Sequence, residues 1–390
     1  MTPAARTQAA IDILDEVIAA ARGGGAAADV LVARYFATRR YAGSKDRRAV
    51  RDLVYAAIRR AGEVPVTGRA ALVGLARDDD GVAATFDGSA HGPAAIEHDE
   101  AAAVAGAVPD WLSRALSASG LAVADQAALV ARAPLDIRIN RLRADPAALA
   151  TELGGEPIAG LPDALRLPTG TNVEPLAGLV EVQDAGSQIV TLAACAKPGQ
   201  HIVDLCAGGG GKTLALAAAM DNRGTLLATD IDRPRLSRLP PRAARAGVTI
   251  VEPRLLDGGR EAAALADWQG HADTVLIDAP CSGTGTWRRN PEARWRLTPA
   301  RLERFTTQQR HVLALGAPLV RPGGALVYIV CSLLDAEGAE QIDRFLADRP
   351  GWTAEPLTLP AGRPRGEGIR LDPAHDGTDG FFVARLARPC

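Results

Sequence analysis

Two cysteines stand directly after apolar runs that have the composition of buried strands. Cys281 follows "TVLIDAP", Cys331 follows "ALVYIV", and each is followed by a serine. A thiolate is a strong nucleophile, and Asp278 beside Cys281 adds a carboxylate that can accept hydrogen bonds. One such cysteine would by default be a small packing residue. Two at equivalent strand ends, one within Asp-Ala-Pro-Cys, indicate chemistry.

A glycine-rich loop, "DLCAGGGGKT", runs from Asp204 to Thr213 between two apolar runs. Its last three residues suggest a phosphate-binding P-loop, but that motif needs a glycine where this chain has Cys206. The alternative template, D-x-x-x-G-x-G after a first strand, is satisfied by Asp204, Gly208 and Gly210. Such glycines let the backbone approach a nucleotide cofactor closely.

Acidic residues follow the loop at the ends of successive predicted strands. Asp230 lies about 20 residues beyond the loop, where a carboxylate can hold ribose hydroxyls. Asp257 ends the third strand, where it could contact an adenine amino group, and Asp278 ends the fourth. This ordered set favours S-adenosylmethionine over ATP. An NAD site is disfavoured because Lys212 replaces the third glycine of that fingerprint, and this lysine could instead pair with the cofactor's carboxylate.

From residue 200 onward, strand-like and helical runs alternate. The strand-like runs are "HIVDLC", "GTLLATD", "GVTIVEP", "DTVLIDAP", "GALVYIVCS" and a final "GFFVARLA". Such alternation predicts an α/β fold with a mostly parallel, doubly wound sheet covered by helices on both faces. In such a sheet ligands bind at the carboxyl ends of the strands, where the loop, the acids and the cysteines fall.

The first 130 residues have a helical pattern instead. Apolar residues recur three and four apart across residues 5–61, and helical patterns return between residues 109 and 130. Residues 76–100 are rich in Asp, Gly and small residues and predict a loop. A strand and a short helix follow between 135 and 155. We therefore expect a helical domain at 1–130, a small α/β linking subdomain at 131–198 and a catalytic domain at 199–390.

Composition sets further bounds. The 390 residues are 47% hydrophobic and 23% charged, as in ordinary globular proteins, and the formal net charge is −2. Residues 39–60 and 288–297 are nevertheless strongly basic, a pattern that fits either solvated helix faces or nucleic-acid binding. Five cysteines without a C-x-x-C pair indicate neither a zinc site nor a disulfide framework, and no metal is expected. Because we find neither a secretory signal nor a membrane-spanning run, we expect a cytoplasmic protein.

The motifs together resemble the RNA cytosine-5 methyltransferases that include the bacterial small-subunit rRNA enzyme and its eukaryotic nucleolar relatives. The resemblance covers residues 135–387 and rests on "VQDAGSQ", "DLCAGGGGKT", "DIDRPRLSRL", "DAPCSGTGTWRRNPEARW", "YIVCSLLDAEGAEQI" and "DGTDGFFVARL". It implies a Rossmann-like class I S-adenosylmethionine methyltransferase domain, preceded by an all-helical NusB-like RNA-binding domain. The family loop usually reads C-A-A-P-G-G-K-T, so Gly208 and Gly209 depart from it. Residues 62–130 are also short for the bacterial rRNA enzyme.

The resemblance also assigns roles to single residues. Cys331 would attack carbon 6 of cytosine, Asp278 would hydrogen-bond the base, and Cys281 would help to release the product. DNA cytosine-5 methyltransferases use the cysteine of the Pro-Cys motif instead, together with a Glu-Asn-Val motif that we do not find here. The cofactor residues expected from the motifs are Cys206, Ala207, Gly208, Gly209, Gly210, Gly211, Lys212, Asp230, Arg235, Asp257 and Asp278.

The expected partner is RNA, in the first place 16S rRNA, bound by a monomer. The RNA-binding residues expected are Arg288, Arg289, Asn290, Arg294 and Trp295, although Trp295 could equally be a packing anchor. Gln183, Asp184 and Ser187 would shape the cofactor pocket or brace the loop, and Gly380 and Phe381 would close the final strand near the site. Three alternatives stay open: the same chemistry on tRNA, a P-loop-like NTPase, and a non-catalytic RNA-binding protein of ribosome assembly.

Overall fold

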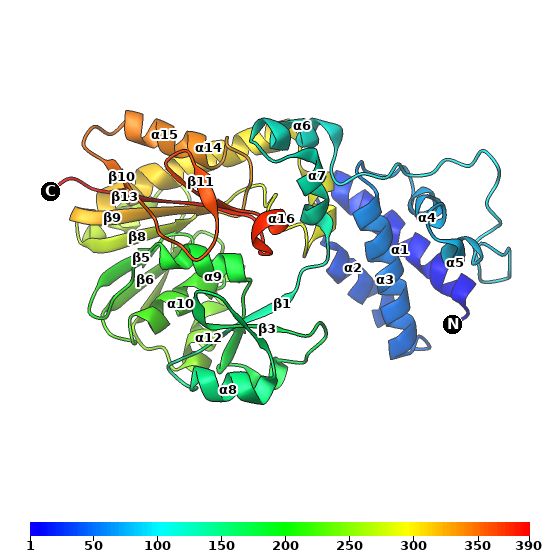
Figure 1. Ribbon diagram of the computed structural model, residues 1–390, viewed down its shortest axis with the longest axis horizontal. Coiled ribbons are helices and arrows are strands. Elements are labelled where there is room, and N and C mark those ends of the chain that lie inside the picture. Colours follow the sequence, from blue (N-terminus) through cyan, green and yellow to red (C-terminus); the bar gives the residue numbers. More distant parts are fainter. The chain divides into compact units, whose positions relative to one another are not determined.

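The computed structural model describes residues 1–390 and contains two compact units (Figure 1). The first comprises Met1–Arg132 and Thr286–Thr298, and the second comprises Ala133–Gly285 and Pro299–Cys390. The predicted linking subdomain, 131–198, therefore lies from residue 133 onward in the same unit as the main sheet. The segment 286–298, which the sequence places in the catalytic domain, belongs to the helical unit. None of the helices combines the length and apolar character that crossing a membrane requires.

The first unit is helical, as the apolar spacing predicts (Figure 1). In α1, the Thr2 side chain accepts a hydrogen bond from the Ala5 amide, and Gly24 ends the helix with a φ of 75°. One face of α1 is buried in the core of this unit. The helices are α1 Pro3–Gly23, α2 Ala28–Ala37, α3 Ser44–Arg60, α4 Gly68–Ala76, α5 Asp80–Ala83, α6 Asp110–Ala118 and α7 Val123–Gln126, with 3₁₀ turns η1 Ala127–Val130 and η4 Pro291–Arg296.

The second unit is built around a nine-stranded sheet with the order β11-β12-β13-β9-β8-β5-β6-β7, in which β10 pairs with β13. The pairs β9-β8, β8-β5, β5-β6 and β6-β7 are parallel, whereas β13 is antiparallel to β9. The strands are β5 His201–Asp204, β6 Thr225–Asp230, β7 Val251–Leu255, β8 Ala272–Asp278, β9 Val320–Val330, β10 Thr353–Glu355, β11 Arg363–Arg365, β12 Gly368–Leu371 and β13 Phe381–Ala387.

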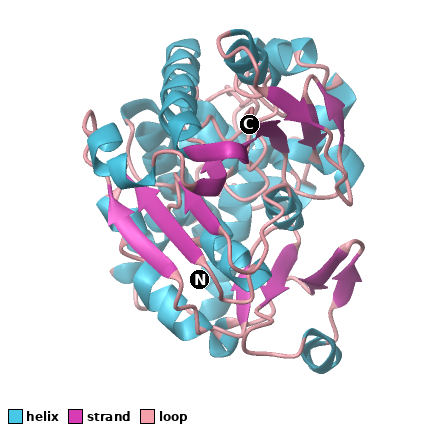
Figure 2. Cartoon of the chain, turned by 90° about the vertical axis from the view of Figure 1, so that its left-hand side faces the viewer, coloured by secondary structure: helices cyan, strands magenta, loops and turns pink.

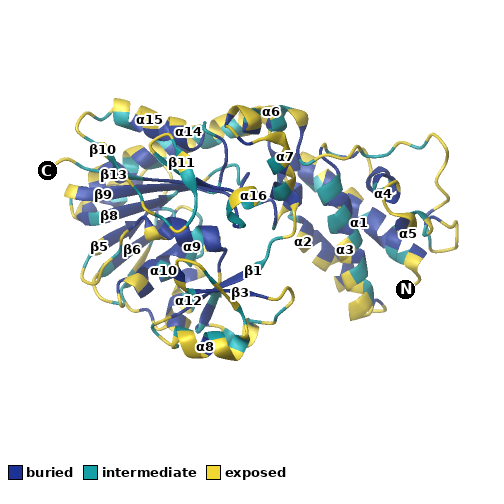
Figure 3. Cartoon of the chain, in the orientation of Figure 1, coloured by how far each residue is buried: buried dark blue, intermediate teal, exposed yellow.

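Helices cover both faces of this sheet (Figure 2). Successive residues of a strand point to opposite faces, so Ile202 packs in one core and Val203 in the other. The central strands are accordingly buried (Figure 3). The helices are α9 Ala185–Leu192, α10 Gly211–Ala219, α11 Arg233–Leu236, α12 Leu239–Ala246, α13 Glu261–Ala264, α14 Pro299–Gly316, α15 Ala339–Ala347 and α16 Pro373–Asp376, with 3₁₀ turns η3 Ala266–Trp268 and η5 Ala317–Leu319.

A separate antiparallel sheet with the order β2-β3-β1-β4 belongs to the same unit. Its strands are β1 Leu135–Ile139, β2 Glu156–Ile158, β3 Leu161–Leu167 and β4 Val180–Val182, accompanied by α8 Pro146–Leu153 and the turn η2 Glu174–Leu176. The sequence predicts β1 and α8 of this group. The Rossmann-like, mostly parallel sheet and the helical N-terminal region are both confirmed.

The strand order reverses at β5. The chain runs from β5 through β6 to β7 on one side of it, and places β8 and β9 on the other. In doubly wound sheets a crevice opens at the carboxyl ends of the strands beside such a switch point. The loops after β5, β6, β8 and β9 carry the glycine run, Asp230, Cys281 and Cys331, so the topology brings the predicted residues to one edge.

Candidate active site

The glycine loop after β5 is held in place by the acid at the end of β6. Gly208 has a φ of 54° and Gly210 a φ of 87°, in the left-handed region that favours glycine. The Gly208 amide donates to Asp230 Oδ2 at 2.8 Å, and the Asp232 amide donates to Asp230 Oδ1 at 2.8 Å. Asp230 thus fixes the turn of the loop, and its remaining lone pairs stay available for hydroxyl groups.

Two arginines act on this loop from the helices that follow β6. A β-carbon on Gly208 would meet the Arg235 guanidinium, so glycine at this position makes room for that arginine. Arg242 donates to the Gly209 carbonyl and, through Nη2, to Glu181 Oε2 at 2.6 Å. The two glycines that depart from the family loop are therefore the two that these arginines approach.

Beneath the loop, Asp204 is fully buried at the end of β5. Thr213 donates to its Oδ2 at 2.6 Å, which links the strand to α10. Burial raises the pKa of Asp204 to about 7, and the hydrogen bond from Thr213 offsets only part of this shift.

A cavity of about 600 Å³ lies at this edge of the sheet, within the range of small-ligand sites. Of the predicted residues, it is lined by Cys206, Asp230, Arg235, Asp278, Cys281 and Cys331. Asp257 is exposed and does not line it, although its neighbour Leu256 does. The expected contact of Asp257 with a ligand in this cavity is therefore not supported by the structure.

Sequence reasoning missed one wall of the cavity, which α14 supplies through Phe305, Gln308, His311, Val312 and Leu315. These positions are three, four and seven apart and form one face of the helix. That spacing is the signal that could have identified them, because α14 was predicted as a helix. The lining also includes Leu205, Ile231, Asp232, Glu261, Ala279 and Pro280.

The two predicted cysteines meet at the cavity. Cys281 Sγ lies 3.3 Å from Cys331 Sγ, although the residues follow different strands. The pKa of Cys281 is raised well above its ordinary value, first by the hydrogen bond to Cys331 and then by burial. Cys281 therefore keeps its proton near neutral pH and can donate it to the sulfur of Cys331.

Lys212 forms an ion pair with Asp278, the acid that precedes Cys281 in the chain. Its Nζ is 2.7 Å from Asp278 Oδ2, and it lies 5.5 Å from the centre of the Phe381 ring. Burial lowers the pKa of Lys212, but the neighbouring Asp278 carboxylate more than offsets this, so the pKa is raised. The lysine thus remains charged in a buried position, where it forms an ion pair with Asp278.

A buried carboxylate, Glu337, joins the two Cys-Ser pairs. Its Oε1 accepts from the Ser282 amide at 2.8 Å, and its Oε2 accepts from the Ser332 hydroxyl at 2.5 Å. Gln309 of α14 donates to Glu337 Oε1 at 3.0 Å. Each serine follows one of the cysteines, so Glu337 fixes the two loops relative to each other. No sequence pattern predicts this role for Glu337.

The remaining predicted supporting residues lie outside the cavity lining. Asp184 caps α9 by accepting from the Ser187 amide at 3.2 Å, and it also accepts from the Asp379 amide at 3.1 Å. Gln183 accepts from Arg138 at 2.9 Å. These residues connect the small sheet to the segment that leads into β13.

The predicted RNA-binding residues divide into two groups within the helical unit. Arg294 is fully buried, and its Nη2 donates to the carbonyls of Ile58 and Ala61 at 2.5 and 2.7 Å. Trp295 is 5% exposed and donates to the Ala61 carbonyl at 3.1 Å. These two side chains are therefore corrected to packing and capping residues, because neither has a surface for RNA.

The other three predicted RNA-binding residues, Arg288, Arg289 and Asn290, differ in how far they are exposed. Arg288 is also buried, at 6% exposed, so it is corrected in the same way. Arg289 is partly exposed and Asn290 is exposed. Only these last two retain a surface that RNA could contact.

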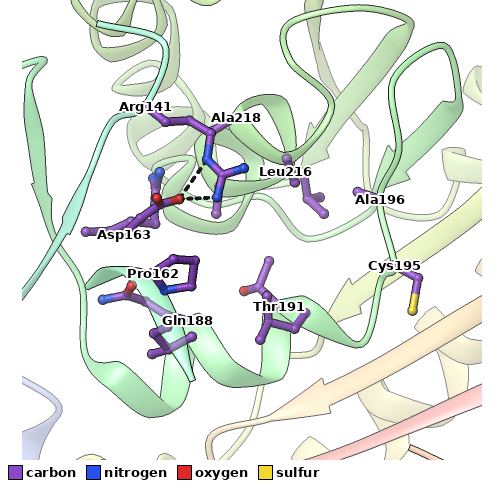
Figure 4. A pocket seen from close by; sticks show the side chains of 14 residues that line it. Arg141, Pro162, Asp163, Gln188, Thr191, Cys195, Ala196, Leu216 and Ala218 are labelled. Carbon is purple, nitrogen blue, oxygen red and sulfur yellow. Dashed lines mark hydrogen bonds and ion pairs between the residues drawn. The ribbon is translucent and has the colours of Figure 1, made fainter. Parts of the chain in front are cut away.

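A smaller cavity of about 200 Å³ lies next to α9 and α10 (Figure 4). An ion pair between Arg141 and Asp163 stands on one side of it, with an N–O distance of 2.6 Å, and Cys195 lies apart from that pair. None of the predicted catalytic or cofactor residues lines this cavity, so it is separate from the candidate site.

The sheet, its switch point and the glycine loop followed by an acid define a Rossmann-like methyltransferase. Residues 191–387, half of the chain, match the family model described as 16S rRNA methyltransferase RsmB/F. The chain belongs to this family.

Curated relatives agree with this assignment. The chain is 37% identical over 269 residues to "Probable ribosomal RNA small subunit methyltransferase B" of Synechocystis sp. and 35% identical over 266 residues to "Ribosomal RNA small subunit methyltransferase B" of Salmonella arizonae. The matches cover 65% and 66% of this chain. They span 60% of the length of each relative.

Solved structures show the same fold. A protein designated PH0851 aligns over 99% of both chains with a TM-score of 0.75 and 23% identity. NSun6 from Pyrococcus horikoshii, solved with SFG, aligns over 72% of this chain and 98% of its own, with a TM-score of 0.63 and 21% identity.

Proposed function

We propose that this protein is an S-adenosylmethionine-dependent RNA methyltransferase that modifies carbon 5 of a cytosine, with 16S rRNA as its substrate. The observation that carries the proposal is the meeting of Cys281 and Cys331, 3.3 Å apart, on a cavity that Asp230 and Asp278 also line. Family membership supports the rRNA substrate, and the matched relatives carry rRNA methyltransferase names.

The residues on the cavity fit S-adenosylmethionine. Positive φ angles at Gly208 and Gly210 keep the loop free of side chains, and Asp230 has lone pairs for ribose hydroxyls. Leu256 and Ile231 give an apolar lining for an adenine ring. When bound, the cofactor supplies an electrophilic methyl group. Lys212 pairs with Asp278, so we do not assign it to the cofactor's carboxylate.

Cytosine carbon 5 is a weak nucleophile until a thiolate adds to carbon 6. We assign this addition to Cys331. Cys281 keeps its proton, so it can donate to the Cys331 sulfur and stabilise the thiolate before attack. Once a carbon–sulfur bond has formed at Cys331, that hydrogen bond is lost.

Asp278 and Lys212 act on the base. Asp278 forms an ion pair with Lys212 at 2.7 Å, and its other carboxylate oxygen can accept from the cytosine amino group. The ion pair also places a positive charge near the ring, which stabilises the electrons that the thiolate pushes into it.

Release requires that carbon 5 lose its proton and that the carbon–sulfur bond break. We assign Cys281 to this step, because its sulfur lies 3.3 Å from that of Cys331. Removal of the carbon 5 proton restores the double bond and expels the Cys331 thiolate. Water takes that proton, and the protonated Cys281 donates a hydrogen bond to the Cys331 sulfur as it leaves.

The proposal is tested by incubating the protein with the labelled cofactor and three RNAs: 16S rRNA, a small-subunit particle and total tRNA. Nucleoside mass spectrometry should then find 5-methylcytidine in the small-subunit RNA. Cys331→Ala should form none. Methylation of tRNA alone would change the assigned substrate from 16S rRNA to tRNA. Binding of RNA without methylation under any condition would favour a non-catalytic role.

A further inference from the structure

A further cavity, of about 400 Å³, is lined only by residues of the helical unit. Four of its seven lining residues are arginines, and we call it the arginine pocket: Arg51, Asp52, Tyr55, Ala56, Arg59, Arg132 and Arg289. Five of these come from α3, at positions three and four apart on one helix face. Arg132 follows η1, and Arg289 precedes η4.

The pocket carries a surplus of positive charge. Asp52 is the one carboxylate in its lining. Arg59 is partly buried, and its Nε has no hydrogen-bond partner. The pKa of Arg59 is lowered, first by burial and then by the positive charge of Arg132. Guanidinium groups close enough to repel each other are stabilised when an anion binds between them.

Tyr55 gives the pocket an aromatic wall. The Arg59 Cζ lies 5.4 Å from the centre of its ring. Burial, and then the nearby Glu292, raise the pKa of Tyr55 to about 12, so its hydroxyl stays protonated and can donate a hydrogen bond. An aromatic ring beside guanidinium groups is the combination that holds an unstacked nucleotide.

We propose that the arginine pocket binds one nucleotide of a single-stranded segment of the RNA substrate. The phosphate is held by the arginines, and the sugar or base lies against Tyr55. A concave pocket suits a strand whose nucleotides are splayed out, whereas a duplex keeps its bases stacked away from such a pocket. This inference rests on the proposed function, since it assigns part of the substrate to a place outside the catalytic cavity.

The test uses the full chain and a double variant, Arg51→Gln/Arg132→Gln, because both side chains are exposed and their loss should spare the fold. Arg34→Gln, an exposed arginine of α2, is the matched control. Fluorescence anisotropy measures binding of a labelled single-stranded RNA and of a duplex of the same sequence. We expect the double variant to bind the single strand at least about tenfold more weakly, with a salt dependence reduced by roughly 0.7 per lost phosphate contact.

Tyr55→Ala, made alone, should also weaken binding of the single strand. Tyr55→Phe should lose only the contribution of the hydroxyl group. The inference is overturned if the double variant binds the single strand as tightly as Arg34→Gln does, or if it loses duplex binding equally. Methyl transfer at saturating RNA separates this inference from the proposed function. Wild-type protein that fails to methylate contradicts the function, whereas a variant with unchanged RNA affinity contradicts the pocket alone.

Discussion

The side chain of Glu337 forms hydrogen bonds with both loops that carry the candidate catalytic cysteines. It accepts hydrogen bonds from Ser282 and Ser332, each of which follows one of the cysteines. A buried carboxylate that accepts from both serines holds the two loops in a fixed relative position. A buried donor that loses its acceptor costs the folded protein about 1–3 kcal/mol. We therefore expect the 3.3 Å separation of the two sulfurs to depend on Glu337 as well as on the cysteines.

We predict that Glu337→Gln lowers kcat about tenfold and leaves the affinity for S-adenosylmethionine unchanged, since one acceptor is replaced by a donor in a fixed network. Steady-state methylation and cofactor titration measure the two effects. Glu340→Gln, at an exposed position of α15, is the control. An unchanged kcat in Glu337→Gln would show that the cysteines are held by the backbone alone.

Asp204 makes the stability of the second unit depend on pH. Its folded-state pKa of about 7 lies above the ordinary value of 3.8, so folding favours the protonated form. Its contribution to stability is present at low pH and is lost as the pH rises from about 4 to about 7.

We predict that Asp204→Asn becomes more stable relative to the wild type as the pH rises from 5 to 8, because the variant has no charge to bury. Denaturant unfolding at each pH gives the difference in free energy between the two proteins. A difference that does not change with pH would contradict the raised pKa.

At the scale of elements, the loop after β8 and the segment before β13 meet backbone to backbone. The Gly380 amide donates to the Gly285 carbonyl at 2.8 Å, and the Gly285 amide donates to the Cys331 carbonyl at 3.0 Å. A β-carbon on Gly285 would overlap the Gly380 carbonyl. Glycine is required at position 285 because the two backbone segments leave no space for a β-carbon between them.

We predict that Gly285→Ala destabilises the protein by about 1–3 kcal/mol and lowers methylation, since the shift needed to relieve the overlap moves Cys331. Thermal unfolding and steady-state methylation measure the two effects. Gly258→Ala is the control, because a β-carbon there meets nothing within 4 Å. Equal stability of the two variants would contradict the close approach.

The sequence predicts the parallel sheet and both cysteines because these depend on local patterns. Long apolar runs predict the strands, and doubly wound topology brings their carboxyl ends to one edge. The sequence does not predict the strands β11 and β12, which are short. It also does not reveal Glu337, whose role depends on contacts between loops far apart in the chain.

The residue types of the basic segment 288–297 predict RNA binding, but Arg288, Arg294 and Trp295 are buried. Arginines beside an asparagine and a tryptophan indicate RNA, yet Arg294 and Trp295 donate to backbone carbonyls at the end of α3. Those carbonyls lack partners within the helix, and side-chain donors satisfy them. The same residue types serve packing or recognition according to burial, which local sequence does not specify.

At the scale of the whole molecule, the helical unit is assembled from two stretches of chain. Trp295 belongs to the core formed by α1, α2 and α3, and Ala28 donates from its amide to Glu292 at 3.0 Å. The loop that carries Cys281 continues directly into this segment. The core of the helical unit therefore includes a residue from the methyltransferase half of the sequence.

We predict that a fragment of residues 1–132 is markedly less stable than the same fragment mixed with a peptide of residues 286–298, because the peptide supplies Trp295 and Arg294. Circular dichroism and thermal unfolding measure this difference. A peptide carrying Arg294→Ala and Trp295→Ala is the control. A fragment that unfolds identically with either peptide would show that the helical residues form their core unaided.

The proposed mechanism requires that Cys331 form the bond to cytosine and that Cys281 help to break it. Its most direct test is to incubate Cys281→Ala with substrate RNA and S-adenosylmethionine, and to separate the products on a denaturing gel. We predict a covalent protein–RNA complex whose linked peptide, identified by mass spectrometry, contains Cys331. The Cys281→Ala/Cys331→Ala variant should form none. A complex linked through another residue, or normal turnover by Cys331→Ala, would contradict the account.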